Sequence, residues 1–142
     1  MRALKLIIIA ITPIVFSSCS AFGKSGDINN FVGEYSVIIS RERTYHVYWN
    51  EKKLKRENEI DPRVGASIYI MENKQFDYID LDGNLYRGKV RCFENYVCFA
   101  GTPIDSSYKF YLKNNEYLEY SYESFHVTLE YDVTYRVIRL VK

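Results

Sequence analysis

The sequence is poor in the side chains on which most catalytic and metal sites depend. Its 142 residues include only two histidines, His46 and His126, and three cysteines, Cys19, Cys92 and Cys98. The cysteines form no CxxC pair and no histidine lies close to them, so there is no signal for a thiol redox centre or a zinc site. A P-loop, a dinucleotide-binding fingerprint and a zinc-protease motif are also missing. We therefore expect a protein without catalytic activity, cofactor or metal.

The chain has no large excess of positive or negative charge. It also has no apolar run long enough to span a membrane. Lys and Arg contribute 19 residues, and Asp and Glu contribute 18. Nucleic-acid-binding domains typically carry a clear basic excess, so we expect no nucleic acid as partner. The one continuous apolar run, Leu6–Phe16, is about half the roughly 20 residues that a membrane-spanning helix needs.

The first 20 residues nevertheless have a distinct composition. Arg2 and Lys5 precede the apolar run, and the small residues of positions 17–21 follow it. This order of basic, apolar and small residues is typical of a secretory signal peptide, which predicts export.

The stretch Phe16-Ser17-Ser18-Cys19 resembles the lipobox of bacterial lipoproteins, in which signal peptidase II cuts before a lipid-modified cysteine. The resemblance implies a signal peptide over residues 1–18 and membrane attachment through lipid on Cys19. Ser20 resembles the default for outer-membrane delivery, so the protein would face the periplasm from the outer membrane. An ordinary signal peptide cut nearby, for example after Ala21, is the alternative.

The remaining chain predicts a tether and one domain. Residues 19–30 are small and polar, as in a flexible linker, and residues 31–142 suit a single domain with one core. Tyr alone supplies 14 residues, and turn residues recur every several positions. This pattern predicts an all-β fold, an antiparallel up-and-down meander of about 8–10 short strands closing as a small barrel or sandwich.

Most of the strands can be placed from the pattern, and one charged segment cannot. The expected strands in the first two thirds are Tyr35–Ser40, Thr44–Trp49, Ser67–Glu72, Gln75–Leu81, Leu85–Phe93 and Tyr96–Ala100. Glu51–Val64 is charged and contains Asp61-Pro62, so we predict a long loop or a short helix. A basic helix that touches lipid headgroups is the alternative.

The last third predicts its own register. A three-residue turn at Asn114–Glu116 would place Leu112 opposite Leu118, and a two-residue turn at Glu123-Ser124 would place Leu118 opposite Leu129. A third turn near Asp132 would bring Val133–Val141 alongside. The apolar face of this meander would include Tyr108, Phe110, Tyr120, Tyr122, Phe125, Tyr135, Val137 and Val141.

The segment Phe31-Val32-Gly33-Glu34-Tyr35 resembles the opening of the first strand in the calycin group, the lipocalins and fatty-acid-binding proteins. The resemblance implies a barrel in which Tyr35 replaces the usual Trp and Arg139 is the basic residue that packs over it. It also implies a second function class, a carrier of a small apolar ligand.

Cys92 and Cys98 predict a disulfide in the exported protein. A three-residue turn at Glu94–Tyr96 would place the two cysteines opposite each other on one face, and export allows a bridge to form. A two-residue turn would send them to opposite faces, and two buried thiols are the alternative.

Two other patterns suggest chemistry but have simpler explanations. Ser121 and His126, with Glu119 or Glu130 nearby, would form an ordinary polar surface pair rather than a catalytic triad. Asp80–Asn84 has its glycine too early for a calcium loop and predicts a hairpin turn.

The aromatic residues that core filling does not explain point to a partner. Trp49, Tyr111 and Tyr117 are expected outside the core, and Tyr and Trp are enriched at protein interfaces. We therefore predict a tethered, non-catalytic protein-binding module of the inhibitor, immunity or envelope-assembly type.

Overall fold

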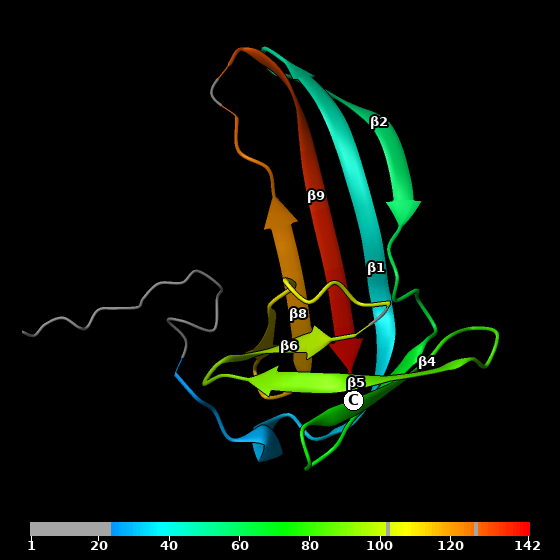
Figure 1. Ribbon diagram of the computed structural model, residues 1–142. Coiled ribbons are helices and arrows are strands. Elements are labelled where there is room, and N and C mark those ends of the chain that lie inside the picture. The colour runs from blue at the N-terminus through cyan, green and yellow to red at the C-terminus, as the bar shows by residue number, and fades with distance from the viewer. Residues whose placement is uncertain (1–23, 102, 127) are drawn as a thin grey trace, which may run out of the picture.

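The computed structural model of the protein describes residues 24–101, 103–126 and 128–142, which form one closed antiparallel sheet (Figure 1). The strands lie in the order β2-β1-β3-β4-β5-β6-β7-β8-β9, and β1 also pairs with β9. The predicted all-β meander is confirmed as a barrel of eight strands, with β2 added to β1. The elements are η4 (Ile28–Asn30), β1 (Gly33–Tyr48), β2 (Glu51–Glu59), β3 (Ser67–Ile70), β4 (Gln75–Ile79), β5 (Leu85–Cys92), β6 (Tyr96–Ala100), β7 (Phe110–Lys113), β8 (Tyr117–Glu123) and β9 (Glu130–Val141).

Cys19 and the predicted signal peptide lie outside the described residues. Within the described ranges, no helix is both long enough and apolar enough to cross a membrane.

Aromatic side chains fill the interior of the barrel. Alternation along the strands turns one side chain in two inward, as β3 and β4 show with Ile68, Ile70, Phe76 and Tyr78. Edge-to-face contacts join Phe76, Phe99 and Phe110, whose ring centroids lie 5.0 and 5.1 Å apart. Among the described residues, six aromatic side chains have at most 1% of their surface exposed: Phe31, Tyr35, Phe76, Tyr78, Phe99 and Phe110.

Tyr35 closes the end of the barrel at which β1 begins. Its hydroxyl donates a hydrogen bond to the Phe31 carbonyl at 2.7 Å, and burial raises the pKa of Tyr35 to about 12. The Lys142 ammonium lies 5.6 Å from the ring centroid. The prediction that Arg139 packs over Tyr35 is wrong, because Arg139 falls between two inward residues and points outward, where it binds Glu119 at 2.6 Å.

The register predicted for β7 and β8 is confirmed, and the one predicted beyond β8 is wrong. Leu112 lies opposite Leu118, whose side chain is fully buried. Leu118 also lies opposite Leu140, not Leu129, because Glu130–Val141 is one continuous strand that satisfies its backbone groups on β1 and β8 together.

This change of register moves several side chains from the predicted core to the surface. Phe125 and Leu129 belong to the loop between β8 and β9, and 85% and 70% of their surfaces are exposed. Tyr122 is in phase with the core but lies at the mouth of the barrel, where it is 42% exposed. The other three residues, Tyr135, Val137 and Val141, are out of phase with the buried Ile138 and Leu140.

The prediction of a loop or helix at Glu51–Val64 is also wrong for its first part. Glu51–Glu59 forms strand β2, in which every residue is exposed. Both faces meet solvent, so the segment shows no hydrophobic alternation, and backbone pairing with β1 together with the Arg43–Glu57 ion pair holds it in place. The register shifts by one residue at Lys55, and bulges and lysines of this kind protect a sheet edge from further pairing.

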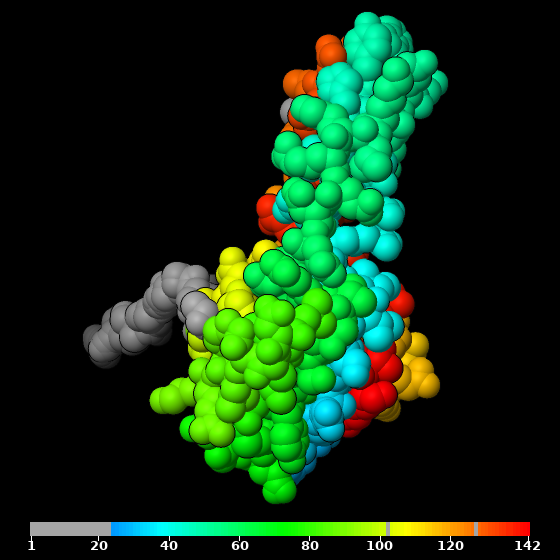
Figure 2. Space-filling view, turned by 90° about the vertical axis from the view of Figure 1, so that its right-hand side faces the viewer, coloured from blue at the N-terminus to red at the C-terminus, as the bar shows by residue number. Residues whose placement is uncertain are grey.

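A three-stranded arm projects from the barrel. It consists of β1 residues 41–48, β2, and β9 residues 130–137. Figure 1 shows these strands continuing beyond β4, β5 and β6, and Figure 2 shows the arm standing clear of the barrel body. The arm exists because β1 and β9, with 16 and 12 residues, are far longer than the 4 or 5 residues of β3 and β4.

The N-terminal segment packs on the barrel, first at the β5–β6 turn and then, with η4, at the end opposite the arm (Figure 1). The Glu94 amide donates to the Lys24 carbonyl at 2.9 Å, and the Gly26 amide donates to the Cys92 carbonyl at 3.3 Å. Ile28, in η4, is buried in the core. Residues 24–30, which we expected to belong to a flexible tether, are therefore held by the domain.

The structure does not contain the predicted Cys92–Cys98 disulfide. The turn between β5 and β6 has two residues, so Cys92 lies opposite Val97 and Cys98 lies opposite Arg91. This register sends the two side chains to opposite faces of the sheet, and burial raises the pKa of the Cys92 thiol.

Candidate functional site

The structure separates the three predicted partner-binding residues into two places. Tyr111 and Tyr117 share the outer face of β7 and β8, where the Tyr96 ring lies 5.1 Å from Tyr111 and the Arg139 guanidinium lies 4.8 Å from Tyr117. Trp49 lies in the turn between β1 and β2 at the tip of the arm, 65% exposed. The tyrosine rings are thus covered in part by their own chain, whereas Trp49 is open to a partner.

The outer face of the arm is apolar and aromatic. Alternation places Tyr45 and Val47 of β1 on this face together with Tyr131, Val133 and Tyr135 of β9. The Tyr45 and Tyr135 rings meet edge to face at 5.8 Å. This face continues the outside of the barrel, because Val133 and Tyr135 are out of phase with the inward Ile138.

The loop after β8 turns this face into a hollow. The Ser124 amide donates to the Thr134 carbonyl at 3.0 Å, and the Ser124 hydroxyl accepts from the Thr134 amide at 2.9 Å. These bonds place Phe125 and His126 beside the face. The resulting tip hollow has a volume of about 350 Å³; Val47, Tyr131 and Val133 lie on its apolar side, and Trp49 and Phe125 also line it.

A second hollow adjoins the first on the same face. This basic hollow, about 250 Å³, is lined by Arg41, Arg43, Tyr45, Lys52, Tyr135 and Val137. The Lys52 ammonium lies 4.7 and 4.6 Å from the ring centroids of Tyr45 and Tyr135, and its hydrogen bond to the Tyr135 hydroxyl raises the pKa of Lys52. Glu57 binds Arg43, whereas Arg41 has no ion-pair partner in the part of the chain that the structure describes.

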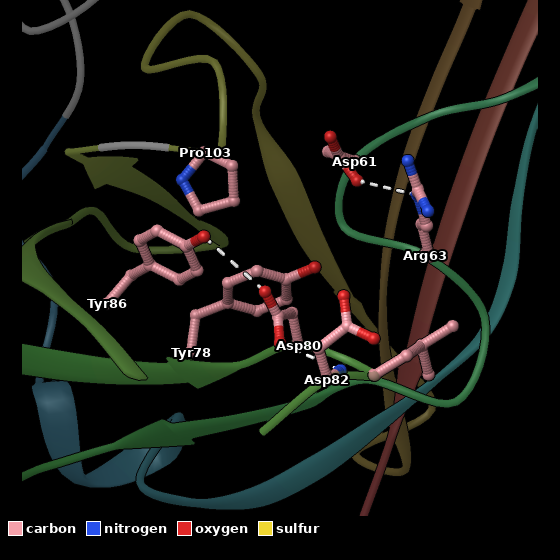
Figure 3. A pocket seen from close by; sticks show the side chains of 8 residues that line it. Asp61, Arg63, Tyr78, Asp80, Asp82, Tyr86 and Pro103 are labelled. Carbon is pink, nitrogen blue, oxygen red and sulfur yellow. Dashed lines mark hydrogen bonds and ion pairs between the residues drawn. The ribbon is translucent and has the colours of Figure 1, made fainter. Parts of the chain in front are cut away.

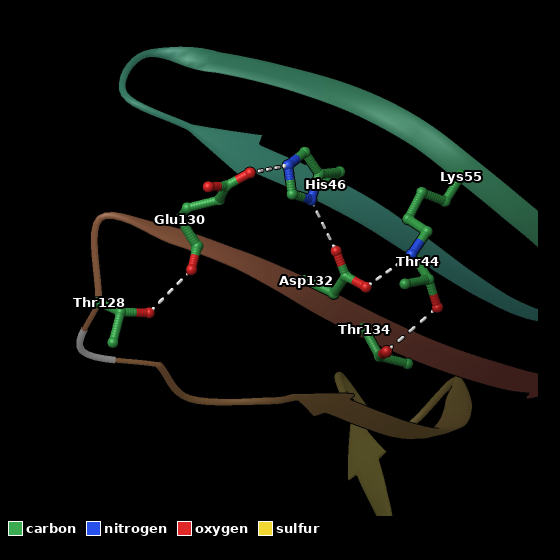
Figure 4. Close-up of polar contacts among 7 residues, drawn as sticks. All are labelled: Thr44, His46, Lys55, Thr128, Glu130, Asp132 and Thr134. Carbon is green, nitrogen blue, oxygen red and sulfur yellow. Dashed lines mark hydrogen bonds and ion pairs between the residues drawn. The ribbon is translucent and has the colours of Figure 1, made fainter.

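The inner face of the arm carries a polar network instead (Figure 4). The two ring nitrogens of His46 lie 2.8 Å from Asp132 and 2.9 Å from Glu130, and Lys55 lies 2.8 Å from Asp132. The hydroxyls of Thr44 and Thr134 lie 3.1 Å apart. No group of three or more His, Cys, Asp or Glu side chains suited to a metal ion occurs among the described residues.

The network changes the titration of its members. The hydrogen bonds to Asp132 and then to Glu130 raise the pKa of His46, because an imidazolium can donate to both carboxylates. The hydrogen bond from Lys55, followed by that from His46, lowers the pKa of Asp132.

We expect the His46 network to stabilise the arm most while His46 is protonated. A raised folded-state pKa contributes stability that is complete below the unfolded value of about 6.5 and is lost as the pH rises through the folded value. An NMR titration should therefore give a midpoint above about 6.5 for His46, and Asp132→Asn should lower it more than Glu130→Gln does. A midpoint that neither substitution moves would contradict the network.

A third hollow lies at the mouth of the barrel (Figure 3), with a volume of about 190 Å³. Asp61, Asp80 and Asp82 line it, but the Asp80 carboxylate accepts the backbone amides of Asp82 and Asn84 at 2.9 and 2.8 Å. The carboxylate thereby closes the hairpin between β4 and β5, as predicted for a turn, and Arg63 binds Asp61 at 3.2 Å. The carboxylates of Asp61 and Asp80 therefore act within the fold.

The serine–histidine pairing considered in the sequence does not form. Ser121 pairs with β9, and His126 approaches Ser124 instead, with Nε2 and Oγ 3.0 Å apart. The two nearby acids, Glu119 and Glu130, bind other cationic side chains. A serine, a histidine and an acid are therefore not assembled as a catalytic triad requires.

The mouth of the barrel is closed beneath the arm. Arg136 binds Glu42 and lies 4.8 Å from the Tyr122 ring centroid, and the Tyr108 and Tyr120 rings stack at 3.9 Å. These side chains cover the aromatic core of the barrel, so the interior is closed to a ligand from this side. The outer face of the arm remains the most exposed of the surfaces described above.

Comparisons with protein-family models, curated proteins and solved structures each found no match.

Proposed function

We propose that this protein is a non-catalytic protein-binding module, lipid-anchored in the bacterial cell envelope, that binds its partner with the tip and outer face of the arm. An inhibitor, an immunity protein or an accessory of envelope assembly would act in this way. The outer membrane, facing the periplasm, is the proposed location.

The observation that carries the proposal is the exposure of large apolar side chains at the tip. Trp49, Phe125 and Leu129 are 65%, 85% and 70% exposed. Leu129 directly precedes Glu130, which pairs with Tyr48, so the loop and the β1–β2 turn end at the same tip. Exposed aromatic anchors beside a hollow are typical of the residues that dominate protein interfaces.

Two other features favour binding on the face of the arm. The edge of β2 is protected by its lysines and its bulge, which disfavours addition of a partner strand. The aromatic filling of the barrel disfavours the alternative, a carrier of a small apolar ligand inside the barrel.

We expect Trp49→Ala combined with Phe125→Ala to weaken partner binding about 100-fold or more, because two exposed anchors are lost. Residues 20–142 would capture partners from an envelope extract, and titration calorimetry with the purified partner would measure affinity. Tyr111→Ala is the matched control on the outer face of the barrel, and its affinity should stay within a few-fold of wild type. If Tyr111→Ala lost the partner and the double variant kept it, the binding surface would be the barrel face.

The anchor is tested separately. We expect Cys19→Ala to abolish acyl labelling and partitioning into detergent, because the thiol that would carry the lipid is gone. Cys92→Ala is the matched control and should label like wild type. Undiminished labelling of the Cys19 variant would exclude the lipoprotein assignment and leave the binding proposal standing.

A further inference from the structure

The two hollows on the outer face of the arm are adjacent and chemically different. Both are lined by Lys52 and Tyr135, so they are neighbours along β1 and β9. The tip hollow offers valine, tyrosine and phenylalanine side chains and Trp49, together with polar side chains that include Glu123 and His126. The basic hollow is lined by three cationic side chains and by no acidic one.

Among the residues that the structure describes, two of the three cationic side chains of the basic hollow already interact with other residues of the chain, and the third does not. Lys52 is held between the Tyr45 and Tyr135 rings, and Glu57 engages Arg43. Arg41 is exposed and makes no ion pair within the described ranges. A guanidinium that is free beside two other cations is suited to a bidentate carboxylate from outside the chain.

The geometry points to a partner that presents an extended segment in which an apolar side chain and an Asp or Glu lie within a few residues of each other. The apolar side chain enters the tip hollow and the carboxylate binds Arg41 in the basic hollow. The inference rests on the proposed function and adds the chemistry of the partner to it.

The segment lies across the face of the arm and adds no strand to the sheet. The protected edge of β2 leaves side-chain recognition as the source of affinity. Lys52 links the two hollows, since its ammonium lies over the aromatic rings while its charge adds to the attraction for the carboxylate.

The test uses random 12-residue peptides displayed on phage, selected on residues 20–142. Enriched peptides should contain an aromatic or aliphatic residue and an acidic residue a few positions apart. Affinities of the synthetic peptides would be measured on wild type, on Trp49→Ala with Phe125→Ala, on Arg41→Gln and on Arg41→Glu. Lys89→Glu, on the exposed outer face of β5, is the matched control for charge reversal.

We expect Arg41→Gln to weaken these peptides about 10-fold and Arg41→Glu to weaken them more, while Lys89→Glu leaves them within about 2-fold. Binding should also weaken as salt is raised. Peptides that depend on Trp49 and Phe125 but carry no acid, or that ignore Arg41, would overturn the inference and leave the proposed function intact. A selection without peptides that depend on the arm would count against both.

Discussion

Replacing Phe99 with alanine is expected to lower the free energy of unfolding by about 3–5 kcal/mol. Phe99 lies on β6 with none of its surface exposed, and it contacts Phe76 on one side and Phe110 on the other. Its removal loses the transfer free energy of one ring and two edge-to-face contacts, and it leaves a cavity that strands on both sides keep open. Urea melts of residues 20–142 would measure the change.

Phe125→Ala is the control, because it removes the same ring from the exposed tip of the arm. Its effect on unfolding should stay within about 0.5 kcal/mol. Equal losses at the two positions would mean that the core does not lie at Phe76, Phe99 and Phe110.

Gly88→Ala is expected to destabilise the barrel by about 3 kcal/mol, at or above the upper end of the usual range for overpacking. Gly88 lies in β5 opposite Phe76, and a Cβ atom there would lie 2.3 Å from the Ala100 carbonyl oxygen and 2.6 Å from the Phe76 ring. Because the oxygen belongs to the backbone of the adjacent strand, β5 would have to move away from β6. Thermal melts followed by circular dichroism would show a lower midpoint.

Gly83→Ala separates this steric effect from the conformational freedom of glycine. Gly83 has φ +86° in the β4–β5 turn, and a Cβ atom on this residue would meet no heavy atom within 4 Å. The substitution should lower the free energy of unfolding by only about 1–2 kcal/mol, the cost of holding alanine in a left-handed backbone conformation. A Gly88 variant no less stable than the Gly83 variant would contradict the close approach of β5 and β6.

The sequence predicts a strand and its neighbour correctly where the strand has one buried face and is followed by a short turn. Asn114–Glu116 placed its hairpin because a wrong register would have buried charge. Asp82-Gly83 marked the turn between β4 and β5 because glycine accepts the positive φ that Gly83 adopts. The strand Glu51–Glu59 could not be predicted, because a strand that is exposed on both faces shows no alternation of apolar and polar residues. Cys92 and Cys98 were misplaced because a turn of two or three residues at Glu94 fits the local pattern equally well.

The candidate site was only partly accessible from the sequence. Trp49 was identified as an exposed aromatic residue, but its hollow depends on the loop that carries Phe125, which the pattern assigned to a strand. Alternation from Arg41 to Val47 was the available signal for an extended outer face. The pairing of that segment with β9, some 90 residues away, could not be deduced from local pattern, since long-range register depends on the whole sheet.

The attachment of Lys24 and Gly26 to the β5–β6 turn determines which side of the domain would face a membrane to which Cys19 is anchored. If Cys19 carries lipid, the five residue steps from Cys19 to Lys24 span at most roughly 18 Å, at about 3.3–3.6 Å each. The barrel would then lie close to the membrane surface with its β5–β6 turn facing the lipid, and Figure 1 shows the tip of the arm far from that turn. Trp49 and Phe125, at that tip, would be held away from the lipid and available to proteins that cannot approach it.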